Sequence, residues 1–299
     1  MYPDSPILFI NKKRSQSTTP GDWGYTCNGG GKSSGLANSV TMVIDMLRAN
    51  GVSCAVEEAV DNNCIDRLVT KHQPSTVIIE ALWVVPEKFE ILHKLHPTVR
   101  WIVRLHSEVP FIANEGMAMG WLRQHSTQAP YVTIAANSTR MCRTLGKLLG
   151  TRISYLPNYY TRDNILSTRS SPDNVINISC FGAIRPLKNH LTQAVAAIQF
   201  ANLLHVPLRF HINGSRVEGN GGAILKNLRE LFPPGGRHTL IEHGWYSHDE
   251  FKQVIRDQID VGMQVSFTES YNIVAADHID CGIPVVTSPE ITFVAWPYT

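Results

Sequence analysis

Short apolar runs alternate with amphipathic stretches along almost the whole chain. In the first half, the apolar runs predict strands at residues 7–10, 52–56, 76–80, 99–105, 131–136 and 152–155. Between them, apolar residues at helical spacing predict helices at residues 34–50, 62–72, 86–96, 116–128 and 138–150. Ser138 is the expected N-cap of the last of these helices.

The second half repeats this rhythm. It predicts strands at residues 177–181, 208–212, 239–241, 261–267 and 283–287, and helices at residues 190–204, 222–232, 247–257 and 273–281. Regular alternation of strand and helix favours parallel sheets with helices on both faces. We therefore expect an α/β protein with two Rossmann-like, doubly wound parallel-sheet domains.

The polar segment 161–174 separates the two halves. It has no strong periodicity and contains Ser170-Ser171-Pro172-Asp173, a composition typical of linkers. We expect a first domain at residues 1–160, a linker at 161–174 and a second domain at 175–299. Ligands of such domains bind at the carboxyl ends of the strands, here in a cleft that both domains face. A Rossmann-like domain usually has another helix after its last strand, so the second domain is either minimal or truncated.

Composition narrows the classes of function. The chain has 299 residues, 43% of them hydrophobic, and a net charge of +2, which gives little support for nucleic acid or an anionic membrane as a partner. No apolar run is long enough for an integral membrane segment, and the N-terminus lacks the pattern of a secretory signal. The six cysteines form no CxxC pair, which favours reduced thiols and a cytoplasmic protein.

The segment 266–288 has the clearest chemical pattern. It predicts a strand end, a polar turn, a helix, a glycine stop and a second buried strand. Glu269 falls in the turn, where its carboxylate could accept hydrogen bonds from sugar hydroxyls, and Asp277 lies about two helical turns further on, where it could bind a ribose diol. The amides and the helix dipole at residues 271–273 attract phosphate. A helix cap and a solvated acid are the alternative interpretation.

A second pattern lies at residues 180–190. A strand ends in glycine, and a turn places two cations just before a helix. Gly182 lets the backbone approach a ligand closely, and Arg185 and Lys188 can neutralise a diphosphate. A basic surface loop is the alternative interpretation of these residues.

Together the two patterns resemble the donor site of retaining GT-B glycosyltransferases, the family 4-like or group 1 glycosyl transferases. In that family an acid, seven residues and a second acid precede a G-x-P-V-V strand, as Glu269, Asp277 and Gly282-Ile283-Pro284-Val285-Val286 do here. Asp277 stands where glutamate is usual, and Ala183 stands where an arginine usually follows the glycine. The resemblance covers most of the chain, and its specific motifs lie in residues 180–288.

The resemblance implies a GT-B fold and transfer of a sugar, with retention, from a nucleotide-diphosphate sugar to an acceptor hydroxyl. It implies catalytic roles for four side chains, which are His106, Glu269, Lys188 and Arg185. Contacts to the donor are implied for Gly30, Gly31, Gly182, Gly214, Trp245, Ser270, Tyr271, Asn272, Ile273 and Asp277. His106 directly follows the predicted strand 99–105, and Trp245 follows the predicted strand 239–241.

The segment Gly29-Gly30-Gly31-Lys32-Ser33 offers a competing interpretation. Gly-Lys-Ser suggests a P-loop, whose backbone amides would cradle phosphates, but Thr26 occupies the position of the first P-loop glycine. An NTPase that uses Lys32 is therefore one alternative function. Two others are a catalytically inactive module that binds nucleotide sugars and a sugar-nucleotide epimerase.

No D-x-D motif is present, and His93 and His96 have no third clear metal ligand in the sequence. We therefore expect a metal-independent transfer, in which cationic side chains and a helix dipole stabilise the leaving diphosphate. The expected small-molecule partner is the donor substrate, without a further cofactor. The acceptor stays open among a glycan, a lipid, a protein, a small molecule and a modified DNA base.

Overall fold

The structure is a computed structural model that describes residues 6–13, 26–27, 35–128, 130–163, 165–168 and 174–293. These residues form two compact units. Unit 1 contains residues 6–13 and 35–161, and unit 2 contains residues 26–27 and the described residues from 162 onward. Two predicted donor contacts, Gly30 and Gly31, lie outside the described residues, as does Lys32.

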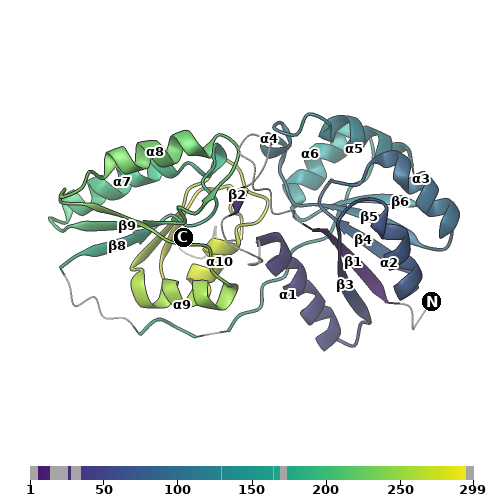
Figure 1. Cartoon of the computed structure of the whole chain (residues 1–299), viewed down its shortest axis with the longest axis horizontal. Coiled ribbons are helices and arrows are strands. Elements are labelled where there is room, and N and C mark those ends of the chain that lie inside the picture. Colours follow the sequence, from purple (N-terminus) through teal and green to yellow (C-terminus); the bar gives the residue numbers. More distant parts are fainter. Residues whose placement is uncertain are drawn as a thin grey trace. The chain divides into compact units, whose positions relative to one another are not determined.

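Unit 1 is built on a six-stranded parallel sheet (Figure 1). The strand order is β3-β1-β4-β5-β6-β7, so the order reverses between β1 and β4. The strands are β1 (Ile7–Lys12), β3 (Cys54–Ala59), β4 (Thr76–Glu80), β5 (Arg100–Leu105), β6 (Val132–Ala136) and β7 (Ser154–Tyr155). The helices are α1 (Gly35–Ala49), α2 (Cys64–His72), α3 (Pro86–Leu95), α4 (Val109–Ile112), α5 (Ala118–Thr127) and α6 (Thr139–Leu149).

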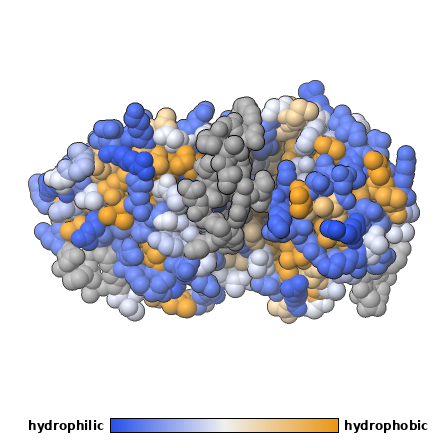
Figure 2. Space-filling view, in the orientation of Figure 1, coloured by the Kyte–Doolittle hydropathy of each residue, from blue (hydrophilic) through white to orange (hydrophobic). Residues whose placement is uncertain are grey.

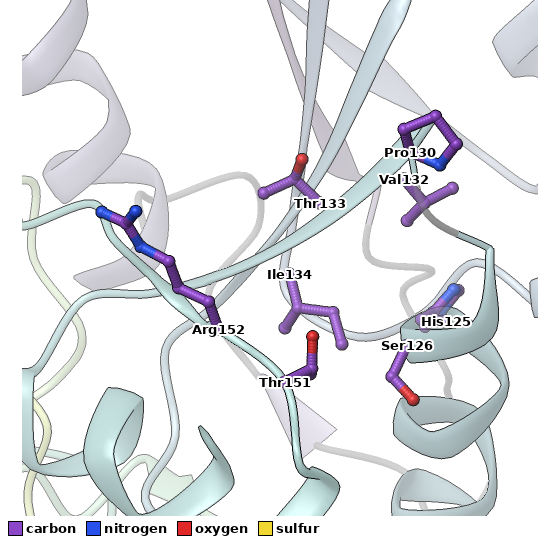
Figure 3. Close-up of a pocket in the computed structure, with 8 residues that line it drawn as sticks. All are labelled: His125, Ser126, Pro130, Val132, Thr133, Ile134, Thr151 and Arg152. Atoms are coloured by element: carbon purple, nitrogen blue, oxygen red, sulfur yellow. The ribbon is translucent and has the colours of Figure 1, made fainter.

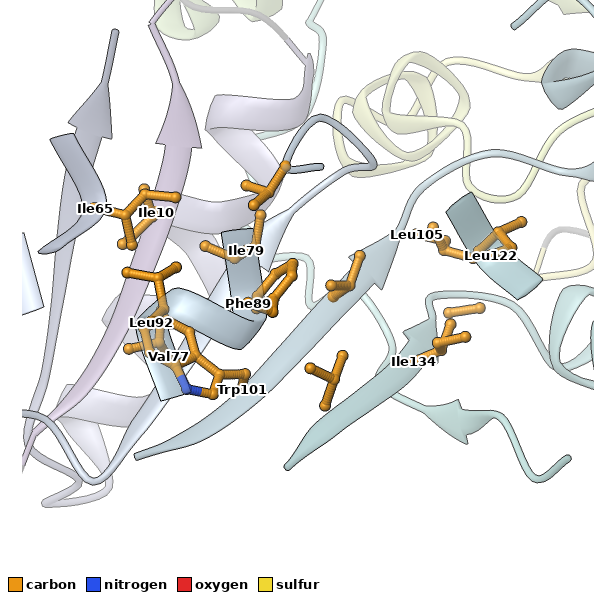
Figure 4. Close-up of a cluster of buried hydrophobic side chains, with 14 of the residues drawn as sticks. Ile10, Ile65, Val77, Ile79, Phe89, Leu92, Trp101, Leu105, Leu122 and Ile134 are labelled. Atoms are coloured by element: carbon orange, nitrogen blue, oxygen red, sulfur yellow. The ribbon is translucent and has the colours of Figure 1, made fainter. Parts of the chain in front are cut away.

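Alternating side chains of the strands place helices on both faces of this sheet. Leu8 and Ile10 of β1 join the larger core, which includes residues of α2, α3, α5 and α6. Figure 4 shows part of this core, where the ring of Phe89 from α3 meets the ring of Trp101 from β5 edge-on, with 5.8 Å between centroids. Phe9 points the other way and packs with residues of α1, such as Val40.

Unit 2 is built on a five-stranded parallel sheet in the order β11-β9-β8-β12-β13. The strands are β8 (Ile176–Ser179), β9 (Leu208–Ile212), β11 (Thr239–Glu242), β12 (Val261–Gln264) and β13 (Val285–Thr287). The helices are α7 (His190–Leu203), α8 (Gly221–Leu231), α9 (His248–Gln258) and α10 (Ile273–Asp280), with a short 3-10 helix η1 (Pro186–Lys188). The strand order reverses between β8 and β12, which is a doubly wound arrangement.

Two cores flank the sheet of unit 2. Ile178 and Phe210 face α7 and α8, whereas Phe181 and Ile283 belong to a second cluster with α9. Figure 1 shows α7 and α8 on one side of this sheet and α9 and α10 on the other. The prediction of an α/β protein with two doubly wound parallel sheets is therefore confirmed.

The structure corrects several predicted elements. The strand expected at residues 261–267 ends at Gln264, because the amide of Val265 donates to the Gln193 side chain (2.8 Å) and the amide of Phe267 donates to the carbonyl of Leu187 (2.9 Å). The strand expected at residues 52–56 is β3, which extends to Ala59.

Among the elements of the described residues, four short ones were not predicted from the sequence, and one of them is the 3-10 helix η1. The helix α4 has four residues, and β2 (Thr26–Cys27) pairs antiparallel with β10 (Arg216–Val217) over two residues. Segments of this length carry too few positions to establish a hydrophobic period.

The surface mixes residue types on the face drawn in Figure 2, where hydrophilic and hydrophobic residues are interspersed. The cysteines whose side chains are described, Cys54, Cys64, Cys142, Cys180 and Cys281, are free thiols. Within the described part of the chain, none of the helices combines the length and the apolar character needed to cross a membrane.

Candidate functional site

The point where the strand order of unit 2 reverses brings two loops together. One follows β8 and ends in η1, which carries Lys188, and the other follows β12 and carries Glu269. The ammonium of Lys188 forms an ion pair with Oε1 of Glu269. The Lys188 side chain is 12% exposed and that of Glu269 is 7% exposed. Two side chains 81 residues apart in the sequence therefore form a nearly buried pair where doubly wound folds bind ligands.

The Glu269 carboxylate has two further hydrogen-bond donors. Its Oε1 accepts from the hydroxyl of Ser266 (2.9 Å) and from Nδ2 of Asn272 (3.2 Å). The same Asn272 amide donates to Oε1 of Gln264 (2.9 Å), at the end of β12. The carboxylate is thus fixed in position before any ligand binds.

Asn272 also determines where α10 begins. Its Oδ1 accepts a hydrogen bond from the amide of Ala275 (3.0 Å), the geometry of an N-cap. Because one side chain both caps the helix and holds Glu269, the carboxylate lies beside the N-terminus of α10. This end of the helix carries positive dipole charge that favours an anion.

Hydrogen bonds to backbone groups join the two loops to each other. Asn189 adopts a left-handed conformation (φ 57°), and its Nδ2 donates to the carbonyl of Val265 (3.1 Å). Two further hydrogen bonds join the same segments, from the Val265 amide to Gln193 and from the Phe267 amide to the carbonyl of Leu187. The Lys188–Glu269 pair therefore belongs to one connected assembly of loops.

Gly182 occupies the first turn after β8. Its φ of 115° is a conformation that residues with a side chain rarely adopt. Its amide donates to Oδ1 of Asn213 (2.8 Å), and Nδ2 of Asn213 donates to the carbonyl of Gly244 (3.1 Å). Asn213 thereby joins the glycine turn to the loop after β11.

Arg185 lies beside a carboxylate that sequence reasoning did not consider. Nη1 of Arg185 lies 3.4 Å from Oε2 of Glu218, and Nη2 of Arg216 lies 2.6 Å from Oε1 of the same carboxylate. The guanidinium of Arg216 also lies over the ring of Trp245, 4.3 Å from its centroid, which is a cation–π contact. Glu218 and Arg216 thus connect two predicted site residues, Arg185 and Trp245.

Asp277 is buried on α10, with 1% of its surface exposed. Its Oδ1 lies 2.7 Å from Nε2 of His248, the first residue of α9. Burial lowers the pKa of His248, but the hydrogen bond and charge of Asp277 outweigh it, so the pKa is raised overall. In this structure, the predicted ribose contact therefore also joins α9 to α10.

Three of the predicted donor contacts lie at the start of α10. Ser270 and Tyr271 are half-buried in the loop, and Ile273 is the first residue of the helix. The ring of Tyr271 stacks on Phe293 with 4.9 Å between centroids, and burial raises the pKa of the Tyr271 hydroxyl.

Gly214 has a packing role that the sequence did not reveal. A Cβ atom at this position would overlap the Glu242 carboxylate and lie 3.0 Å from its Cβ. Glu242 is held there by Arg229, whose Nε donates to its Oε1 (2.7 Å). A side chain at this position would therefore displace Glu242 from its ion pair with Arg229, whether or not a ligand approaches the glycine.

His106 belongs to unit 1 and follows β5. Its Nε2 is hydrogen-bonded to the carboxylate of Glu80, which ends the neighbouring strand β4. Nη1 of Arg104 donates to the other oxygen of Glu80 (3.1 Å), and Nη2 donates to Oδ1 of Asn158 (2.6 Å). Glu80 and Arg104 are fully buried, so the histidine rests on a charged pair within the core.

Burial and charge act in opposite directions on this cluster. Burial lowers the pKa of His106, and the Glu80 carboxylate offsets only part of that effect. Burial raises the pKa of Glu80, but His106 and Arg104 outweigh it and lower the pKa. We infer a neutral His106 whose Nε2–H donates to an ionised Glu80.

A pocket of about 170 Å³ lies elsewhere in unit 1, between the end of α5 and the strand β6 (Figure 3). Its lining includes Thr133, Arg152 and His125. None of the predicted site residues lines it, and burial lowers the pKa of His125. We assign this pocket no part in the candidate site.

The residues that sequence reasoning missed are mostly partners of those it found. Glu80 pairs with His106, Glu218 with Arg185, and His248 with Asp277. Each partner lies 26 to 33 residues away in the sequence. Only the position of Glu80 carried a signal, because a carboxylate at the end of a buried apolar run is unusual.

Comparison with known proteins identifies the fold. No protein-family model and no curated protein sequence matches the chain. Among solved structures, a trehalose-6-phosphate synthase studied for glycosyl transfer with retention shares 11% identity, with 96% of this chain and 84% of that chain covered and a TM-score of 0.63. A trehalose-6-phosphate structure from E. coli bound with UDP-2-fluoro glucose shares 11% identity, with 96% and 86% covered and a TM-score of 0.62.

The catalytic domain of starch synthase IV from Arabidopsis thaliana, bound to ADP and acarbose, is similar to the same extent. It shares 8% identity, with 98% of this chain and 85% of that chain covered and a TM-score of 0.65. These matches span nearly the whole chain and both of its units. The chain therefore has the GT-B fold.

Proposed function

We propose that this protein is a retaining, metal-independent glycosyltransferase. It moves a sugar from a nucleotide-diphosphate sugar to an acceptor hydroxyl. One observation carries the proposal, which is the Lys188–Glu269 pair beside the N-terminus of α10, where the strand order of unit 2 reverses. A cation, a carboxylate and a helix N-terminus at such a point suit a diphosphate attached to a sugar.

In this proposal, the cationic groups of the site bind the donor diphosphate. Lys188 and Arg185 neutralise the charge that develops as the diphosphate leaves, and the amides at the start of α10 donate hydrogen bonds to it. Gly182 lets the backbone approach the phosphates. Stabilisation of the leaving group by fixed charges is the form of catalysis that the proposal needs, and it requires no metal ion.

The two carboxylates bind the sugar and the ribose of the donor. Glu269 accepts hydrogen bonds from sugar hydroxyls when Lys188 turns toward the phosphates, because the carboxylate is already held by Ser266 and Asn272. Asp277 accepts a hydrogen bond from the ribose while it remains bonded to His248. These are the ligand groups that the sequence patterns predicted for the two carboxylates.

The proposal gives His106 a contact to the donor sugar. With Nε2–H donated to Glu80, the ring can only accept a hydrogen bond through Nδ1, which lies 3.5 Å from Nδ2 of Asn137. In the proposal a sugar hydroxyl takes the place of that amide, so His106 acts as an acceptor and not as a general acid. Support for retention comes from the similar fold of the trehalose-6-phosphate synthase studied for transfer with retention. The acceptor is proposed only as a hydroxyl compound.

An inactive nucleotide-sugar-binding module is the second candidate. Two observations favour it, because Asp277 already has a partner in His248 and the buried Ala183 replaces the arginine that usually follows the glycine. Such a module would bind donors without turnover. Product analysis distinguishes the two candidates, since only the enzyme releases the nucleoside diphosphate in the presence of an acceptor.

Thermal unfolding with a panel of UDP-, GDP-, ADP- and TDP-sugars tests the proposal. A ligand that binds the native state raises the unfolding temperature, and the rise increases with the logarithm of the ratio of ligand concentration to Kd. We expect one class of donor to stabilise the wild-type chain, and Lys188→Ala to abolish that shift. Lys188→Arg serves as the matched control, because it keeps the charge and should keep part of the shift.

Lys32→Ala separates this proposal from a P-loop NTPase. The proposal requires that Lys32→Ala keeps donor binding while Lys188→Ala loses it. The opposite pattern, or no shift of the wild-type chain with any donor, would overturn the assignment.

A further inference from the structure

A chain of hydrogen bonds crosses the sheet of unit 2 and ends at the loop after β11. It begins at Asp260, just before β12, whose Oδ2 accepts from Nδ2 of Asn177 on β8 (3.0 Å). Oδ1 of Asn177 lies 3.2 Å from Nε2 of His211 on β9. Nδ1 of His211 lies 2.8 Å from Nε2 of His243, and Nδ1 of His243 lies 3.3 Å from the hydroxyl of Tyr246.

With a neutral His211, these contacts fix the direction of every bond. The Asp260 carboxylate can only accept, so the Asn177 amide group donates to it and leaves its carbonyl oxygen for His211. That oxygen also only accepts, so His211 carries its proton on Nε2. A neutral His211 then accepts at Nδ1, which requires a proton on Nε2 of His243.

The last bond in the chain concerns Tyr246. A neutral His243 with its proton on Nε2 accepts at Nδ1, so the Tyr246 hydroxyl must donate inward to it. His243 is buried, and burial lowers the pKa of its imidazole, which keeps it neutral at neutral pH. The Tyr246 oxygen then has only acceptor capacity left for any other group.

The loop that carries Tyr246 is held close to the glycine turn. Asn213 bonds to both Gly182 and Gly244, which precedes Trp245 and Tyr246 by one and two residues. Arg216 covers one side of the Trp245 ring. A ligand whose phosphates lie at Gly182 would therefore extend its other end toward Trp245 and Tyr246.

We propose that Tyr246 is a specificity-determining contact of the donor nucleotide, where its oxygen accepts a hydrogen bond from a ring or amino N–H of the base. Asp260, Asn177, His211 and His243 are positioning residues that orient the Tyr246 hydroxyl. This inference rests on the function proposed above, since it requires a nucleotide donor. The inference adds that Tyr246 is the acceptor and the base the donor in this hydrogen bond. A base that offers only an acceptor at this position is therefore excluded.

Isothermal titration with UDP, GDP, ADP and TDP, and with inorganic pyrophosphate as a probe without a base, tests the inference. Tyr246→Phe removes only the hydroxyl. We expect it to weaken the best nucleoside diphosphate about tenfold, the effect of one lost hydrogen bond, and to leave pyrophosphate binding unchanged. Tyr131→Phe in unit 1 is the matched control and should change neither.

His243→Leu tests the positioning role. It removes the acceptor for the Tyr246 hydroxyl, so we expect the same base-dependent loss as for Tyr246→Phe, again with unchanged pyrophosphate binding. His243→Gln offers both an N–H and a carbonyl, and we expect it to restore part of the affinity. Circular dichroism establishes that each variant is folded.

The outcomes separate this inference from the proposed function. Equal loss of nucleotide and pyrophosphate binding in Tyr246→Phe would show a merely structural role, and unchanged nucleotide binding would show no contact. Either result overturns the inference but leaves the proposed function standing. A wild-type chain that binds neither nucleotides nor pyrophosphate would overturn both.

Discussion

Two neighbouring glycines at the start of α8 differ in what surrounds them. A Cβ atom on Gly221 would overlap the carbonyl oxygen of Ile184 and lie 2.8 Å from its carbon, whereas a Cβ atom on Gly222 would meet nothing within 4 Å. Gly221 therefore permits the close approach of α8 to the strand-like segment at Ile184, next to Arg185. The conformational freedom of glycine is not required at either position, since neither has a positive φ.

Substitution of these glycines by alanine tests this packing. We expect Gly221→Ala to lower the free energy of unfolding by ~1–3 kcal/mol, the usual cost of overpacking. Gly222→Ala is the matched control and should raise the free energy of unfolding by up to about 1 kcal/mol through helix propensity. Urea unfolding measures both, and equal effects of the two substitutions would contradict the packing argument.

A second residue-scale prediction concerns His248. Its pKa in the folded chain lies above the usual value of 6.5, because Asp277 outweighs burial. The charged imidazolium therefore stabilises the fold fully below pH 6.5, and this contribution is lost as the pH rises through the raised pKa. Urea unfolding of the wild type and His248→Gln should differ most at low pH and converge as the pH rises. A difference independent of pH would show that the ion pair does not stabilise the fold.

The sequence predicted single residues of the candidate site but not the residues that pair with them. Lys188 and Glu269 were each predicted from a local pattern, and the structure pairs them. Glu218 and His248 gave no such pattern, because a partner brought close by the sheet topology can lie at any distance in the sequence. Glu80 gave only the signal of a carboxylate at the end of a buried apolar run, which does not say what it pairs with. Gly214 had a local pattern whose explanation, the neighbouring Glu242, was equally remote.

At the scale of elements, prediction succeeded where a period extends over several turns or alternations. The strands β4 and β9 were predicted with their observed bounds, and α7 was predicted to within one residue. β12 was predicted too long, because Val265 and Phe267 continue the alternation. Their amides instead bond to the side chain of Gln193 in α7 and to the carbonyl of Leu187 in η1. Tertiary contacts, which no local pattern records, thus decided this boundary.

The N-terminus of α9 gives an element-scale prediction. Ser247 and Glu250 form a capping box, in which Oε2 of Glu250 accepts from the Ser247 amide (2.8 Å) and the Ser247 hydroxyl accepts from the Glu250 amide (3.4 Å). We expect Ser247→Ala to lower the free energy of unfolding by about 1 kcal/mol. Ser247→Thr keeps the hydroxyl and should be nearly neutral in the same urea titration. Equal losses in both variants would indicate that the hydroxyl does not cap the helix.

At the scale of the whole molecule, each unit has its own sheet and its own cores. The candidate donor residues of unit 2 lie on α10 and on loops that side chains such as Asn213 and Asn189 join to one another. A ligand bound at these loops stabilises unit 2 against local unfolding, because the contacts within each cooperative region set its local stability. The strands β4 and β5 of unit 1 are stabilised instead by their own core.

Hydrogen exchange can therefore locate the donor within the molecule. We expect a bound nucleoside diphosphate to slow amide exchange at the start of α10 and in the turn at Gly182, since these amides are the proposed phosphate contacts. Exchange in β4 and β5 should not change. Lys188→Ala should remove the protection in unit 2 at the same nucleotide concentration. Protection confined to unit 1 would place the nucleotide away from the Lys188–Glu269 pair, and the whole assignment of donor residues would then be wrong.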